Sequence, residues 1–214
     1  MQLNQEARKR VIIVDDFYAN PDEVRAFALR QAFQPNPKDH KGQRTRERFA
    51  FPGIKERFEQ LLGMRIINWD KYGYNGVFQF CVGGDPIVYH SDAQMWAAVV
   101  YLTPDAPPSA GTAIYRSRAT KGRTVAESQK VMAYRPAFSG PGKVPASERE
   151  CEQLMYQNKL LDRTAWEQVD VMGNVYNRLA MWDARLVHAA TDYFGTDVNN
   201  GRLFQMFFFD VEGR

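Results

Sequence analysis

The pattern of apolar and polar positions divides the chain into a helical start and a strand-rich remainder. Residues 10–17 read RVIIVDDF and predict a short buried strand. A helix is predicted next, because Asn20 and Pro21 form a typical helix start and apolar residues then recur at helical spacing. A second amphipathic helix is predicted over 52–63, after a polar, basic stretch at 38–49 that indicates an exposed loop or an irregular strand.

Strand signals dominate from residue 65 onward. Seven short segments are rich in β-branched and aromatic residues and are separated by Gly, Pro, Asn and Asp. One of them alternates, so that Gln79 and Cys81 are expected on one face and Phe78 and Phe80 on the other. The predicted strands cover residues 65–69, 76–84, 95–103, 111–116, 177–182, 185–190 and 202–210.

Residues 117–168 interrupt the run of strands. A Pro- and Gly-rich stretch leads there into helical periodicity over 146–169, which we interpret as an insertion between strands. Helices before and within a series of short strands predict an α+β fold with a β-sandwich or jelly-roll core. We expect a single domain, in which residues 1–74 support a core formed by residues 75–210.

Composition narrows the class of protein. With 214 residues, 44% hydrophobic and 13% aromatic, the chain can build a large core and is not typical of a disordered protein. The net charge of +3 gives no strong reason to expect a nucleic-acid partner. Cys81 and Cys151 are too few for a disulfide scaffold, which favours a reducing compartment.

The N-terminal apolar run is too short for a signal peptide, and no stretch approaches the ~20 apolar residues of a membrane span. We therefore expect a cytoplasmic protein with no membrane partner, and a homodimer is compatible with the sequence.

Two of the three histidines lie beside apolar, strand-like segments. His90 and Asp92 are two residues apart at the entrance to a predicted strand, so their side chains share a face. His188 lies within a later segment of the same kind. Two His and one Asp are the ligands that leave open positions on non-haem iron(II). A lone histidine in a strand is more often a core residue with its hydrogen bonds formed than a metal ligand. A structural role for these side chains therefore stays open.

Arg202 opens the strongly apolar segment 202–210. An arginine buried at that position would need an anionic partner. At an exposed strand end it would instead pair with Asp192 or Asp197. The order of an HxD pair, a distant histidine and then an arginine is more specific than any of these residues alone, and it favours a metal site with an anion site next to it.

The order His90-x-Asp92, His188 and Arg202 resembles the iron(II)- and 2-oxoglutarate-dependent oxygenases, particularly their prolyl-hydroxylase-like branch. The resemblance covers residues 75–210. It implies a double-stranded β-helix, a jelly-roll or cupin-like core, in which both histidines and the aspartate are catalytic ligands of Fe(II). It also implies that O2 and 2-oxoglutarate are consumed, that succinate and CO2 are released, and that an unactivated C–H bond is hydroxylated or otherwise oxidised. Halogenating relatives carry Gly or Ala in place of the carboxylate, so Asp92 favours a hydroxylase.

The resemblance extends to the pocket around the metal. It implies that Arg202, helped by Tyr101, binds the distal carboxylate of 2-oxoglutarate, with Thr112 and Gln79 in the same pocket. Further strand positions near this pocket are candidate contacts to the substrate. These candidates are Trp96, Tyr115, Arg116 and Arg178.

Basic residues indicate the class of substrate, and alternative functions stay open beside it. Arg116 and the basic segment 38–48 can hold a carboxylate, which favours a small-molecule substrate such as an amino acid, free or peptide-borne, under a lid formed by the insertion. A non-catalytic jelly-roll binding module is an alternative, as is a metalloenzyme without 2-oxoglutarate, which leaves Arg202 unexplained. The isoelectric point of about 8.8 also suggests a nucleic-acid- or protein-directed dioxygenase. Phe208 opposes a repair enzyme, because that branch usually carries a second arginine there.

Overall fold

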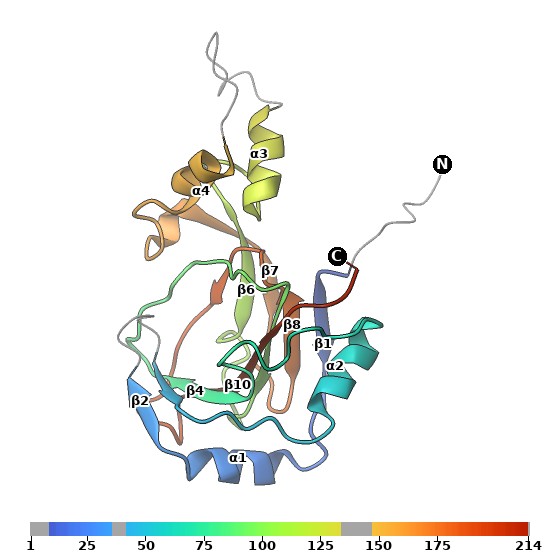
Figure 1. Ribbon diagram of the computed structural model, residues 1–214. Coiled ribbons are helices and arrows are strands. Elements are labelled where there is room, and N and C mark those ends of the chain that lie inside the picture. The colour runs from blue at the N-terminus through green and yellow to red at the C-terminus, as the bar shows by residue number, and fades with distance from the viewer. Residues whose placement is uncertain (1–8, 36–41, 134–146, 214) are drawn as a thin grey trace.

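Two facing antiparallel sheets form the centre of the computed structural model, which describes residues 9–35, 42–133 and 147–213 (Figure 1). The strands are β1 (Val11–Val14), β2 (Phe33–Pro35), β3 (Gln43–Thr45), β4 (Val77–Cys81), β5 (Trp96–Tyr101), β6 (Thr112–Ser117), β7 (Trp166–Met172), β8 (Leu179–Asp183), β9 (His188–Ala190) and β10 (Arg202–Phe209). The larger sheet has the order β1-β8-β5-β10-β4-β3-β2, and the smaller sheet has the order β7-β6-β9.

The path of the chain between the two sheets defines a double-stranded β-helix. From β4 in the larger sheet, the chain crosses to the smaller sheet at His90. This residue forms an isolated bridge with His188, the first residue of β9. It returns to β5, crosses to β6 and β7, returns to β8, crosses to β9 and returns to β10. Strands of the two sheets therefore interleave along the sequence. The predicted jelly-roll core in an α+β fold is confirmed.

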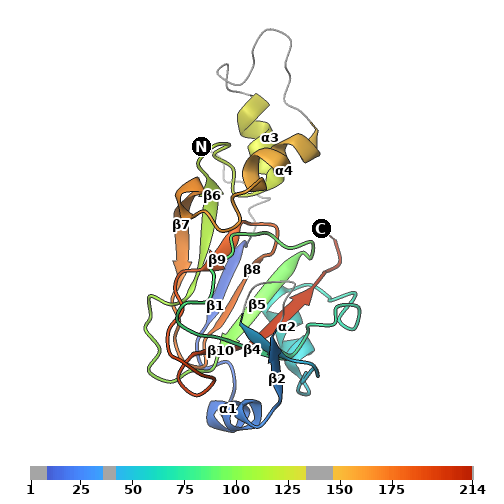
Figure 2. The same ribbon diagram turned by 90° about the vertical axis from the view of Figure 1, so that its left-hand side faces the viewer.

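The helices form two groups around this core. They are α1 (Pro21–Leu29), α2 (Ile54–Leu62), α3 (Val125–Ala133) and α4 (Glu148–Tyr156), with a 3-10 turn at Arg163–Ala165. The helices α1 and α2 pack on the outer face of the larger sheet, where Phe58 lies 5.0 Å from Phe207 and 5.2 Å from Phe209 between ring centroids. The helices α3 and α4 lie together beyond the ends of β6 and β7 (Figures 1 and 2). None of the helices in the described part of the chain has the length and apolarity of a membrane span.

Alternation along β5 separates the two layers of the core. Trp96 and Val100 join the cluster beneath α1 and α2, whereas Val99 and Tyr101 join the cluster between the two sheets. The strand β4 follows the same rule, and the predicted facing of its residues is confirmed. The inward set of side chains surrounds the space between the sheets, where the predicted site residues are expected.

Two sequence predictions differ from the structure. Residues 166–168, assigned to the insertion and its helical periodicity, begin β7 instead. The middle of this strand is exposed and polar, so it lacks the apolar alternation that marks a strand. The predicted strand 65–69 is wrong, because only Ile66 forms a bridge there, to Val211. Within the basic stretch, β3 is the irregular strand, and residues 36–41 lie outside the described residues.

Candidate functional site

Backbone pairing brings the two strand-associated histidines together. The His90 amide donates to the His188 carbonyl at 3.1 Å, and the His188 amide donates to the His90 carbonyl at 2.8 Å. The Asp92 amide donates to the Ala184 carbonyl at 2.8 Å, which fixes the HxD segment against the turn before β9. Segments about a hundred positions apart in the sequence are thereby held side by side before any ligand contributes.

Each imidazole is oriented by a hydrogen bond at its inner nitrogen. His90 Nδ1 lies 3.0 Å from the Val88 carbonyl, and His188 Nδ1 lies 2.8 Å from the Leu186 carbonyl. A carbonyl only accepts, so Nδ1 carries the proton in both rings and Nε2 keeps its lone pair in the neutral form. Backbone orientation of this kind is what a metal-ligating histidine needs.

The outer nitrogens of both histidines converge on one carboxylate. His188 Nε2 lies 3.2 Å from Asp92 Oδ2, and His90 Nε2 lies 3.8 Å from Asp92 Oδ1. One ligand atom from each of the three side chains lies within 4.8 Å of the others, close enough to share one ion. Among the described residues, this is the only group of three or more His, Cys, Asp or Glu side chains with that property. Two imidazoles and one carboxylate suit iron(II) and leave further positions open.

Arg202 lies in the same interior and is 4% exposed. Its guanidinium donates to the Ala110 carbonyl at 3.1 Å, to the Gly111 carbonyl at 3.3 Å and to Thr112 Oγ1 at 3.0 Å. The Tyr101 hydroxyl lies 2.9 Å from the same Thr112 oxygen. The structure thus brings together three of the residues expected around the co-substrate, on three strands of both sheets.

The charge of Arg202 has no carboxylate partner within ion-pair distance among the residues that the structure describes. Its nearest titratable neighbours do not balance it. Burial raises the pKa of the Cys81 thiol, with the Arg202 charge opposing that shift, and burial likewise raises the pKa of the Tyr193 phenol. Both groups are therefore neutral near pH 7. A buried cation whose neighbours are neutral donors, carbonyls and rings is suited to bind an anion.

One cavity of about 80 Å³ connects the triad with Arg202 and Thr112. The strand β10 contributes three apolar lining residues that were not among the candidate site residues, Phe204, Met206 and Phe208. They follow Arg202 at a spacing of two. Because every second residue of a strand lies on the same face, the position of Arg202 could have predicted them. The other lining residues are Gln79, Val88, Ala97, Ala98, Val99, Trp182, Ala189, Ala190 and Tyr193.

The four predicted substrate residues do not line this cavity. Trp96 is fully buried on the opposite face of β5. Tyr115 packs in an aromatic cluster behind β6, and burial raises the pKa of its phenol to about 12. Arg116 and Arg178 each form a two-point ion pair with a neighbouring carboxylate, at 2.8 and 2.9 Å and at 2.6 and 3.0 Å respectively. Their substrate roles stay predictions.

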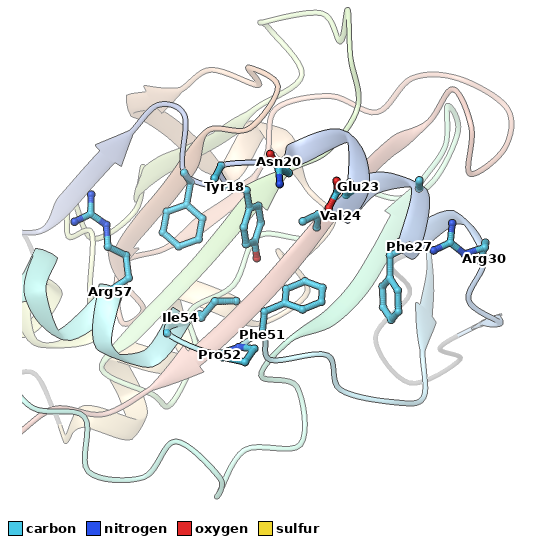
Figure 3. A pocket seen from close by; sticks show the side chains of 14 residues that line it. Tyr18, Asn20, Glu23, Val24, Phe27, Arg30, Phe51, Pro52, Ile54 and Arg57 are labelled. Carbon is cyan, nitrogen blue, oxygen red and sulfur yellow. The ribbon is translucent and has the colours of Figure 1, made fainter.

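A larger cavity, of about 680 Å³, lies between α1 and α2 (Figure 3). Its walls are mostly apolar and include Tyr18, Phe27 and Phe51, with Arg57 from α2 among the lining residues. It contains none of the triad residues and does not include Arg202. The smaller cavity is therefore the candidate site because of the chemistry of its lining residues and not because of its volume.

Comparison with protein families gives one match. The model of the Family of unknown function (DUF6445) matches residues 85–209, a range that contains all three triad residues and Arg202. A comparison with curated proteins found no match.

Solved structures provide a third comparison. The non-heme alpha ketoglutarate dependent epimerase SnoN from nogalamycin biosynthesis is 14% identical, with a TM-score of 0.50 over 93% of this chain and 75% of that chain. HygX from Streptomyces hygroscopicus with nickel, 2-oxoglutarate and hygromycin B bound is 12% identical, with a TM-score of 0.49 over 93% and 82%. A Pseudomonas putida prolyl-4-hydroxylase is 16% identical, with a TM-score of 0.43 over 95% and 93%. At this level of identity, the likeness to SnoN shows a shared fold.

Proposed function

The chain belongs to the Family of unknown function (DUF6445), and we propose that it is an iron(II)- and 2-oxoglutarate-dependent oxygenase. One observation supports the proposal above all others. A triad of His90, Asp92 and His188 lines the same cavity as a buried arginine that has no carboxylate partner among the described residues. A structural role for the triad alone would leave the buried charge of Arg202 without a reason.

The triad fits iron(II) in donor type and in orientation. His90 and His188 would each supply Nε2, because their Nδ1 protons are held by backbone carbonyls. Asp92 would supply a carboxylate oxygen and balance part of the metal charge. Iron(II) bound with 2-oxoglutarate and O2 supplies the oxidising chemistry, with succinate and CO2 as products of the co-substrate.

The arginine end of the cavity fits the distal carboxylate of 2-oxoglutarate. Arg202 offers a planar guanidinium, and Thr112 adds a hydroxyl that Tyr101 holds in place. Gln79 lines the same cavity and is buried. The apolar residues of β10 exclude water between the two ends, which strengthens both polar interactions.

Asp92 bears on the type of oxidation. It lies at the position that halogenating oxygenases fill with Gly or Ala, so its carboxylate occupies the place of a halide. We therefore favour hydroxylation, or another oxidation without halide, of an amino acid or an amino-acid-derived or peptidyl small molecule. Residues of α3 and α4 line a cleft that also contains Asp92, which supports the insertion as a cover of the site.

The proposal is tested with anaerobically purified protein. We expect one Fe(II) per chain and slow formation of succinate from 2-oxoglutarate in the presence of O2. His188→Ala should abolish both, whereas Arg65→Gln, a change at an exposed side chain, should leave both unchanged. Metal-independent succinate formation, or full activity of His188→Ala, would overturn the assignment of the triad.

A further inference from the structure

A second cleft reaches Asp92 from outside the cavity already described. It has a volume of about 450 Å³ and shares only Asp92 with the inner cavity. Its walls come from α3, from the first residue of α4, from the turn between β8 and β9 and from the segment before β1. A group bound in this cleft would therefore lie next to a proposed metal ligand without displacing anything at the arginine end.

The wall of the cleft is fastened to the metal-binding segment. Ser91, which lies between His90 and Asp92, lines the cleft. The Tyr156 hydroxyl of α4 donates to Ser91 Oγ at 2.8 Å. Burial raises the pKa of Tyr156 to about 12, so this donor keeps its proton at neutral pH. Helix α4 is thus held next to the segment that carries Asp92.

The cleft is lined by three cationic and four anionic side chains, and two ion pairs join four of these seven. Arg10 Nη1 lies 2.8 Å from Glu127 Oε1. Arg185 forms a two-point ion pair with Asp183, at 2.9 and 3.0 Å. Besides these two pairs, the lining carries Lys130, Glu148 and Asp92, and Asp92 belongs to the proposed metal site. A polyanion such as nucleic acid gains little there, because carboxylates outnumber cations in the lining and two of the three cations already have a carboxylate beside them.

Two charged residues of the cleft remain available to a ligand. Lys130 of α3 and Glu148 of α4 are exposed, and neither makes a hydrogen bond or ion pair with another described residue. They carry opposite charges and come from the two helices of the insertion. A ligand with one carboxylate and one ammonium group would satisfy both.

We propose that this cleft binds the molecule to be oxidised, and that this molecule is a small zwitterion, an amino acid whose ammonium and carboxylate groups are both free. Lys130 binds its carboxylate and Glu148 binds its ammonium group, which leaves its side chain to approach the metal beside Asp92. The cleft volume lies within the range of roughly 300–1,000 Å³ that is usual for small-molecule sites. This inference rests on the proposed oxygenase function for the reaction, but the binding that it requires can be measured without turnover.

The test is calorimetric titration of the full chain, loaded with Mn(II) and 2-oxoglutarate, with each of the twenty standard amino acids. Each amino acid that binds is compared with its N-acetyl and its carboxamide derivative, which remove one charge each. We expect at least one free amino acid to bind, and each blocked derivative to bind roughly 3- to 5-fold more weakly, as for one exposed ion pair.

Variants assign each charge to its partner. Glu148→Gln should weaken binding of the free amino acid roughly 3- to 5-fold and should abolish the difference between it and the N-acetyl derivative. Lys130→Gln should likewise weaken binding of the free amino acid, and it should abolish the difference in affinity between the free amino acid and its carboxamide derivative. Glu152→Gln and Arg149→Gln change exposed charges of α4 outside the cleft and should have no effect.

Two outcomes separate this inference from the proposed function. If 2-oxoglutarate is converted to succinate but no free amino acid binds, or binding ignores Lys130 and Glu148, the cleft assignment is wrong and the oxygenase stands. If amino acids bind with the expected dependence but no succinate forms under any condition, the cleft assignment stands and the oxygenase is wrong.

Discussion

At the scale of single residues, the buried charge of Arg202 has the clearest consequence. Arg202→Gln removes the cation while keeping a polar side chain of similar reach. We expect the affinity for 2-oxoglutarate to fall by about 2–5 kcal/mol, a loss of ~30-fold or more, because a desolvated carboxylate is left without its partner. Titration of the Mn(II)-loaded variant with 2-oxoglutarate measures the change. Arg65→Gln is the matched control, since its side chain is 81% exposed, and equal affinities in the two variants would contradict the role of Arg202.

Asp92 provides the second prediction at this scale. Asp92→Ala removes one of the three proposed ligands and the only anionic one among them. We expect metal affinity to fall more than ~100-fold, because loss of a supporting hydrogen bond to a ligand alone costs roughly 10- to 100-fold. Asp70→Ala, at an exposed carboxylate, is the control. Metal content after dialysis measures the effect, and retention of one equivalent by the Asp92 variant would exclude that side chain as a ligand.

The residue types of the candidate site could be predicted, but their surroundings could not. His90, Asp92, His188 and Arg202 are conspicuous because histidines are few and a charged residue opens an apolar strand. The position of Tyr193 in the cavity depends on how the chain leaves β9, and no local pattern encodes that path. Contacts of this kind are set by pairing between distant segments.

At the scale of elements, Gly111 holds the start of β6 close to the end of β7. A Cβ at this position would lie 2.0 Å from the Met172 carbonyl oxygen, so Gly111→Ala must separate the two strands. The carbonyl of Gly111 also accepts a hydrogen bond from Arg202, so the anion site should shift with it. We expect a loss of about 1–3 kcal/mol in the free energy of unfolding, measured by denaturant titration. Gly73→Ala, where a Cβ meets nothing within 4 Å, should change it little, and equal stability of the two variants would refute the close approach.

Helices and strands with a buried apolar face could be predicted from the spacing of their apolar residues, and those without such a face could not. The helix α1 follows the expected spacing because one face packs in a core, and the strands β4 and β5 do so because each packs its two faces in two core clusters. The strand β7 lies at the edge of the smaller sheet with a polar, exposed centre, so its sequence resembles the helix before it. Pairing with β6, rather than its own pattern, decides its structure.

At the scale of the whole molecule, ligands that bind only the folded chain should stabilise it. Metal and 2-oxoglutarate at ~100 times their dissociation constants should each add about 2.7 kcal/mol at saturation. For a chain of this size, that corresponds to a rise of roughly 5–10 °C in the melting temperature for each ligand. Thermal unfolding with Mn(II), with 2-oxoglutarate and with both measures the effect. The co-substrate should raise the melting temperature mainly when metal is present, and a rise of the same size without metal would contradict a shared site.

The most direct test of the central claim is anaerobic calorimetric titration of 2-oxoglutarate into Fe(II)-loaded and metal-free protein. The arrangement of the triad and Arg202 around one cavity predicts one 2-oxoglutarate per chain in the loaded protein and much weaker binding in the metal-free protein. Equal affinity in the two preparations, or no binding in the loaded one, would contradict an iron- and 2-oxoglutarate-dependent site.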